Sequence, residues 1–112
     1  MAGSGSVWAE ETTIFDAAEA GWTADGVNLT TGTTTVGVVT WYGGGSSAID
    51  NGSTVAGKSW SKRLKFGGKS TTQSNSTLVR VLKFNVAESG TVKVYAVTGS
   101  NDKDRYFIFL NH

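Results

Sequence analysis

Apolar and polar residues alternate through the second half of this chain. Leu64 and Phe66 share one parity and Arg63 and Lys65 share the other. Side chains on a β-strand point to opposite faces with a period of two residues, so this alternation predicts a strand with one buried face. The strands predicted in this way cover residues 60–66, 78–86, 92–97 and 105–110.

The first half has one strong strand candidate, residues 36–42 (VGVVTWY), and two weaker ones at 12–15 and 27–29. Clusters of Gly, Ser, Thr, Asn and Asp separate the runs and are typical of turns. Residues 78–82 and 106–110 are apolar on both faces, which predicts central strands covered on both sides. Together these patterns predict an all-β fold: an antiparallel β-sandwich of jelly-roll type.

A length of 112 residues predicts a single domain. We expect residues 1–8 to be a leader or linker remnant and residues 9–112 to form one module. No apolar run approaches the roughly 20 residues that span a bilayer, so we predict no contact with a membrane. The chain has no Cys and its one His is His112, which removes disulfides, thiolate metal sites and most histidine chemistry.

Charge is distributed unevenly although the net charge is only +1. All ten Lys and Arg residues lie at or after Lys58, where three acidic residues accompany them, and the other six acidic residues precede it. Strands from the second half can therefore place several cations on one surface. A basic patch on a nearly neutral protein indicates a selective anionic ligand, whereas nucleic-acid binding calls for a more basic balance.

Residues suited to catalysis are scarce. Glu10 and Glu11 are adjacent and would point to opposite faces of a strand, while Asp102 and Asp104 lie in a turn that suits a solvated hairpin. The glycine run at 43–45 lacks the Lys-Ser/Thr pair of a phosphate-binding loop. We therefore predict no enzyme activity, no cofactor and no metal site.

Binding is better supported. Arg63 and Lys65 project together from one strand, Arg80 and Arg105 lie on later strands, and Tyr95 takes the outward parity of its own strand. Guanidinium and ammonium groups bind carboxylates, and an aromatic ring beside them can stack on a sugar.

Each of these positions also has a structural interpretation. Arg80 shares parity with core positions and could be held by a carbonyl, and Arg105 could pair with a neighbouring Asp. Trp60 continues the inward parity of Leu64, so we expect it in the core. The four Trp are more often core than platform in so small a domain; Trp41, next to the glycine-rich loop, is the one that we single out for ligand contact.

Three segments carry a family resemblance: residues 61–68 (SKRLKFGG), 80–86 (RVLKFNV) and 90–107 (GTVKVYAVTGSNDKDRYF). They resemble the β-sandwich carbohydrate-binding modules attached to bacterial pectate lyases. The resemblance covers roughly residues 36–110. It implies a non-catalytic module of a secreted bacterial enzyme that degrades plant cell walls, with basic residues that engage the carboxylates of homogalacturonan. The residues that match the family's basic positions and Tyr are Lys62, Arg63, Lys65, Arg80, Tyr95 and Arg105.

The sequence thus predicts a monomeric module that binds uronate-rich pectin and is attached to a catalytic domain. Binding should weaken as methyl esterification rises, since esterification removes the carboxylate charge, and Arg63→Ala or Lys65→Ala should reduce it. Two alternatives stay open. One is a Trp-lined groove for a neutral β-glucan, xyloglucan or mannan; the other is a structural or adhesive β-sandwich that acts through protein contacts.

Overall fold

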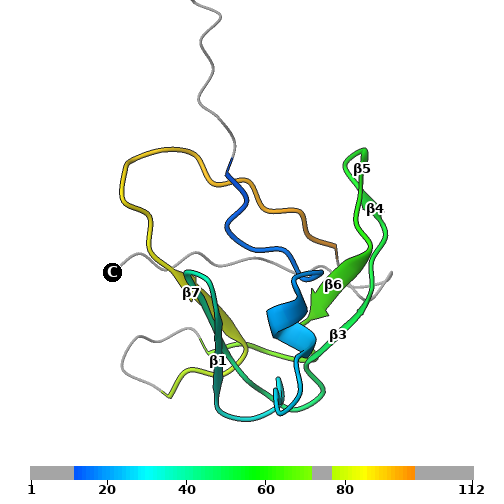
Figure 1. Ribbon diagram of the computed structural model, residues 1–112, viewed down its shortest axis with the longest axis vertical. Helices are drawn as coiled ribbons and strands as arrows, with labels where there is room; N and C mark the ends of the chain where they lie inside the picture. Colours follow the sequence, from blue (N-terminus) through cyan, green and yellow to red (C-terminus); the bar gives the residue numbers. More distant parts are fainter. Residues whose placement is uncertain (1–11, 72–76, 98–112) are drawn as a thin grey trace, which may run out of the picture.

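Antiparallel hairpins build the part of the chain that the computed structural model describes, residues 12–71 and 77–97. The elements are η2, a 3₁₀ turn (Ala20–Thr23), and the strands β1 (Thr33–Val36), β2 (Val39–Tyr42), β3 (Ala48–Asn51), β4 (Thr54–Val55), β5 (Lys58–Ser59), β6 (Lys62–Lys65) and β7 (Val81–Phe84) (Figure 1). Within these ranges the strands form one three-stranded sheet in the order β1-β2-β7 and two strand pairs, β3-β6 and β4-β5.

The predicted all-β antiparallel class is confirmed, because every strand pair is antiparallel and the helical content of the described residues is slight. No sheet of the described part closes on another, so the jelly-roll sandwich stays a prediction. None of the helices in the described ranges has the length and apolar character needed to cross a membrane.

The predicted strand at 36–42 is wrong as a single element. Gly37 has a φ of 60° and turns the chain, so that Val36 pairs with Val39 across a two-residue turn. Glycine at the first central position is what a type II′ hairpin requires, because that position has positive φ. The weaker candidates at 12–15 and 27–29 are not strands either.

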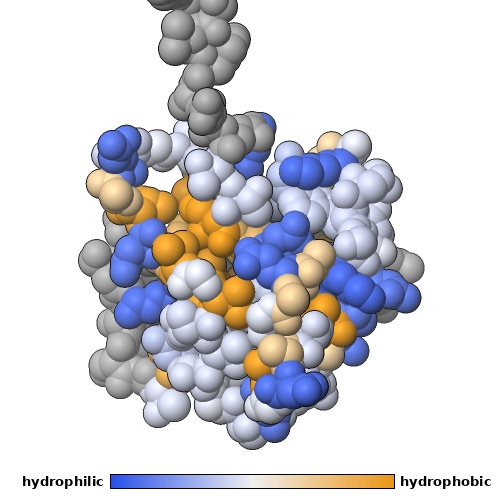
Figure 2. All heavy atoms as spheres, in the orientation of Figure 1, coloured by the Kyte–Doolittle hydropathy of each residue, from blue (hydrophilic) through white to orange (hydrophobic). Residues whose placement is uncertain are grey.

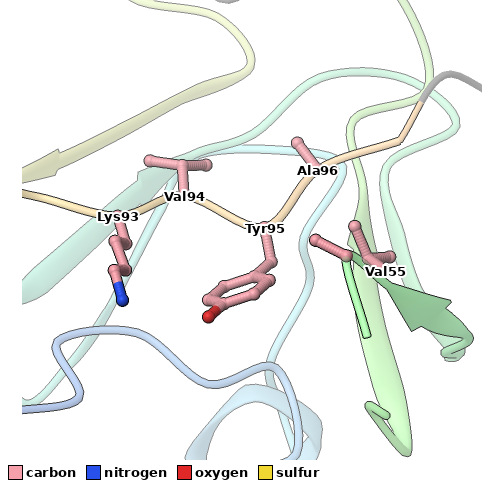
Figure 3. Close-up of a pocket in the computed structure, with 6 residues that line it drawn as sticks. Val55, Lys93, Val94, Tyr95 and Ala96 are labelled. Atoms are coloured by element: carbon pink, nitrogen blue, oxygen red, sulfur yellow. The ribbon is translucent and has the colours of Figure 1, made fainter. Parts of the chain in front are cut away.

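The later predicted strands have mixed outcomes. β7 is shorter than the predicted run at 78–86, and residues 92–97 have no strand pairing, with the side chain of Val94 49% exposed. In the same segment Lys93 and Tyr95 project to one side while Val94 and Ala96 project to the other, as the alternation predicts (Figure 3). The run at 105–110 lies outside the described residues.

Residues 48–65 form one long hairpin although they are divided among four strands. The pairing Ala48↔Lys65 at the open end continues without a shift to Val55↔Lys58 beside the turn. Backbone hydrogen bonds Gly52 N→Ser61 O (3.0 Å) and Trp60 N→Ser53 O (3.1 Å) bridge the gap between the two ladders. These two bonds lie on consecutive residue pairs, whereas a regular antiparallel ladder bonds alternate pairs, so the hairpin consists of two ladders with an irregular join at Gly52.

The core lies between the three-stranded sheet and the open end of this hairpin. Its fully buried members are Trp22, Val39 and Trp41, with Leu29 at 9% exposure. The Trp41 indole N–H donates to the Leu29 carbonyl (2.9 Å). Partly buried side chains from the segment before β1, from the sheet, and from the hairpin and the residue that follows it pack around them: Ile14, Phe15, Val27, Val36, Ile49, Leu64, Phe66, Leu82 and Phe84.

Candidate functional site: a lysine over two aromatic rings

The two faces of the long hairpin carry different chemistry. Directly paired residues and those two apart share a face within one ladder. In the β4-β5 ladder Val55 and Lys58 form a direct pair, with Trp60 two residues from Lys58. In the β3-β6 ladder Lys62 shares a face with Leu64, which packs on the core at the open end. Arg63 and Lys65 lie on the opposite face, with Asp50 as the cross-strand partner of Arg63.

Near the hairpin turn the β4-β5 ladder meets the extended segment 91–97. The rings of Trp60 and Tyr95 are 5.1 Å apart between centroids and tilted by 53°. The Lys58 ammonium stands 4.5 Å from the Trp60 centroid and 5.3 Å from the Tyr95 centroid. We call Lys58, Trp60 and Tyr95 the cation–aromatic cluster. A cation at these distances is attracted to the negative face of each ring, which holds an exposed ammonium over a partly exposed aromatic surface.

A shallow cleft of about 340 Å³ opens beside the cluster. It lies between the β4–β5 turn and the extended segment, and its lining residues are Val55, Ala56, Lys93, Val94, Tyr95 and Ala96 (Figure 3). Figure 2 shows apolar surface exposed near the middle of the drawn face, with hydrophilic side chains on both sides of it. Cation, rings and apolar walls thus meet in one place.

Arg63 is engaged by Asp50 on the opposite face. Its Nε donates to Asp50 Oδ1 (2.5 Å) and its terminal Nη2 donates to Oδ2 (3.0 Å), a bidentate pair with side chains 43% and 39% exposed. The hydrogen bond from Arg63, with the charges of Arg63, Lys65 and Lys62, holds the pKa of Asp50 below its usual value against the opposing effect of burial. The same pairing raises the pKa of Arg63. An anionic ligand would have to compete with Asp50 for this guanidinium.

The Asp50–Arg63 pair predicts a small loss of stability in acid. A carboxyl whose pKa is lowered on folding stabilises the fold above its unfolded pKa of about 3.9, and that contribution disappears as the pH falls through the lowered folded value. An exposed pair contributes about 0.2–1 kcal/mol. Urea midpoints of Asp50→Asn should therefore lie slightly below those of the unchanged protein at pH 7 and converge with them in strong acid. A constant difference across this range would contradict the assignment.

Arg80 is held by backbone carbonyls, the second of the two interpretations that the sequence left open. Its terminal nitrogens donate to Gly45 O (2.6 Å) and Lys69 O (3.1 Å). A Cβ on Gly44 would lie 2.5 Å from Arg80 Cγ, and one on Gly68 would lie 2.9 Å from Arg80 Cζ, so the side chain lies close against two glycine backbones. Its own φ is 55°, in the left-handed region. Arg80 therefore joins the loop that contains Gly45 to the loop that contains Lys69, and we call this arrangement the Arg80 clamp.

Other predicted site residues have different positions. Trp41 is fully buried with its indole N–H bonded, which corrects the proposed ligand contact: no face of the ring is open to a ligand. Lys62 is exposed on the face opposite to Arg63 and donates to Asn51 Oδ1 (3.4 Å). Lys65 is exposed. Arg105 lies outside the described residues.

Among the described residues, the basic side chains predicted to form the site therefore do not lie together on one surface of the protein. Arg63 and Lys65 share a face as predicted, whereas Tyr95 belongs to a cluster with Lys58 and Trp60, which the sequence reasoning did not select. Trp60 is only partly buried and not a core residue. The signal that could have found the site was Lys58, which lies two residues from Trp60 beside the Ala-Gly turn.

Comparisons with protein-family models, curated proteins and solved structures find no match to this chain. Within residues 12–71 and 77–97, no group of three His, Cys, Asp or Glu side chains is placed to hold a metal ion. The arrangement of the site thus carries the functional argument alone.

Proposed function

We propose that this protein is a non-catalytic module that binds acidic polysaccharide of the uronate-rich, pectic type, and that the cation–aromatic cluster is the centre of its site. The observation that carries the proposal is the Lys58 ammonium standing over the rings of Trp60 and Tyr95. A sugar stacked on an aromatic ring presents its substituents at the rim, where an ammonium can pair with a carboxylate.

A second exposed lysine lies on the neighbouring ladder of the same hairpin. Lys62 is on β6 and donates to Asn51 Oδ1, whereas Lys58 is on β5. A polymer that spans both ladders can offer a separate carboxylate to each ammonium group. The same proposal includes that the module is attached to a secreted enzyme that degrades plant cell walls.

The lining of the cleft supports binding without catalysis. Glycosidases place two carboxyl groups on either side of the bond that they cleave. Among the described residues that line the cleft, the side chains are aliphatic or aromatic except for that of Lys93, and none is a carboxylate. The chemistry of this surface is that of holding a sugar chain.

Lys58→Ala should reduce binding to unesterified polygalacturonate about tenfold, because it removes the ammonium and leaves the rings in place; this corresponds to about 1.4 kcal/mol. Retardation in affinity gels measures the effect, and added salt should weaken the retardation of the unchanged protein because exposed ion pairs are screened. Lys83→Ala is the matched control, since Lys83 is an exposed lysine on β7 and the change removes the same charge from another sheet.

Other outcomes would reassign the site. An equal loss of affinity in Lys58→Ala and Lys83→Ala would mean that the polysaccharide is attracted by the overall charge and is not held at a defined site. Loss in Arg63→Ala or Lys65→Ala alone would move the site to the face of β6 that carries Arg63 and Lys65. Salt-insensitive retention on neutral glucans would favour sugar stacking on Trp60 and Tyr95 without charge. Absence of retention on every polysaccharide would refute polysaccharide binding and favour a module that acts through protein contacts.

A further inference from the structure

The cleft beside the cation–aromatic cluster is more apolar than binding of a carboxylate requires. Val55, Ala56 and the ring of Tyr95 are among its lining residues, and Val94 and Ala96 line it from a segment on which their side chains point away from that ring (Figure 3). Val94 is 49% exposed and Tyr95 is 36% exposed. A uronate ring can stack its C–H face on Tyr95, but its carboxylate gains nothing by contact with aliphatic side chains, whereas an ester methyl group does.

The cleft is continuous with the cluster. Val55 is the direct cross-strand partner of Lys58, so the two side chains leave the hairpin on the same face. Tyr95 belongs to both, since it lines the cleft and its ring centroid lies 5.3 Å from the Lys58 ammonium. A sugar that contacts the Tyr95 ring therefore lies near the Lys58 ammonium and near the aliphatic side chain of Val55.

The β4–β5 turn, which forms one side of the cleft, carries an unusual residue for its turn type. Ala56 and Gly57 have φ of 51° and 81°, the two positive values of a type I′ turn, whose first position favours Asn, Asp or Gly. Alanine in the left-handed region costs about 1 kcal/mol or more. An apolar residue is thus present at the cleft where a polar one would suit the backbone better, and strain of this kind clusters at binding sites.

We propose that the cleft accepts a short ester substituent with a terminal methyl group, as on a partly esterified uronate chain, while Lys58 engages a carboxylate that remains free. This inference rests on the proposed function and reverses part of the expectation from sequence. Affinity does not fall steadily with esterification; it is greatest for chains that carry both free and esterified units. Burial of one methyl group strengthens binding about fourfold.

Calorimetric titration with galacturonan of one chain length tests this, in unesterified, partly methyl-esterified, fully methyl-esterified and partly acetylated forms. The unchanged protein should bind a partly esterified form about fourfold more tightly than the unesterified form, and the fully esterified form more weakly than either. The methyl and acetyl arms show which ester the cleft takes. Val55→Thr keeps the side-chain size and introduces a hydroxyl; it should lower the affinity for the partly esterified form more than the affinity for the unesterified form, so that the preference disappears.

Val38→Thr is the matched control, because Val38 lies at the β1–β2 turn with 64% of its surface exposed. Val38→Thr should change neither the affinity for the partly esterified form nor the affinity for the unesterified form. A steady fall of affinity with esterification in the unchanged protein, or equal effects of Val55→Thr on all forms, would overturn the inference and leave the proposed function standing. No heat of binding with any form would overturn both.

Discussion

Trp41→Ala should lower the free energy of unfolding by about 3–5 kcal/mol, the usual cost of removing a large buried aromatic side chain. The Trp41 ring has no exposed surface, contacts Phe66 edge-on at 4.9 Å between centroids, and belongs to the core cluster with Val39. Replacement leaves a cavity and also removes the indole donor to Leu29 O. Urea denaturation followed by circular dichroism gives the midpoint and slope that measure this loss.

Trp41→Phe separates the core role from the ligand contact that the sequence suggested. Phenylalanine keeps most of the buried ring and loses the hydrogen bond, so the expected cost is about 1–3 kcal/mol, the penalty for an unsatisfied buried group. The folded variant should bind polysaccharide as the unchanged protein does. A loss of affinity in folded Trp41→Phe would restore Trp41 to the site.

Arg80→Ala should lower the free energy of unfolding by about 3 kcal/mol, because two hydrogen bonds from a charged group are lost together. Gly45 O and Lys69 O lose their donors, and the space beside Gly44 and Gly68 is left unfilled. Ser70 Oγ also donates to the Arg80 carbonyl (2.5 Å), so the strained backbone is anchored at the same point. Thermal unfolding measures the loss.

Arg80→Lys should recover little of this stability, since an ammonium lacks the planar fork that reaches two carbonyls on different loops. Lys83→Ala, an exposed change on β7 three residues away, should have almost no effect on stability. The folded Arg80 variants should retain affinity for polygalacturonate. Normal stability together with lost binding would contradict the Arg80 clamp and favour the ligand role that the resemblance implies.

Several particulars of the fold were predictable because they depend on neighbours in sequence. Alternation at residues 63–66 determines that Arg63 and Lys65 share one face and Leu64 takes the other, and the paired register confirms it. Gly37 shows how one residue limits such reasoning. It sits inside a run that looks like a single strand, and only its positive φ divides that run into a hairpin.

The site was less predictable because its members come from distant parts of the chain. Arg80 is bound to Gly45, 35 residues away, and Tyr95 contacts Trp60 from a segment with no strand pairing. Parity states on which face of its own strand a side chain lies, but not which other segment covers that face. Trp60 and Lys58 therefore looked like a core residue and a surface charge.

The sequence by itself determined the all-β antiparallel class, the alternation of faces at residues 62–65, and a surplus of cations in its second half. These follow from the period-two geometry of an extended chain and from composition. Only the tertiary structure decided which cations are already engaged, by Asp50 or by loop carbonyls, and which one stands over aromatic rings beside an open cleft. That outcome depends on how the long hairpin and the 91–97 segment pack together, and such contacts leave no local pattern in the sequence.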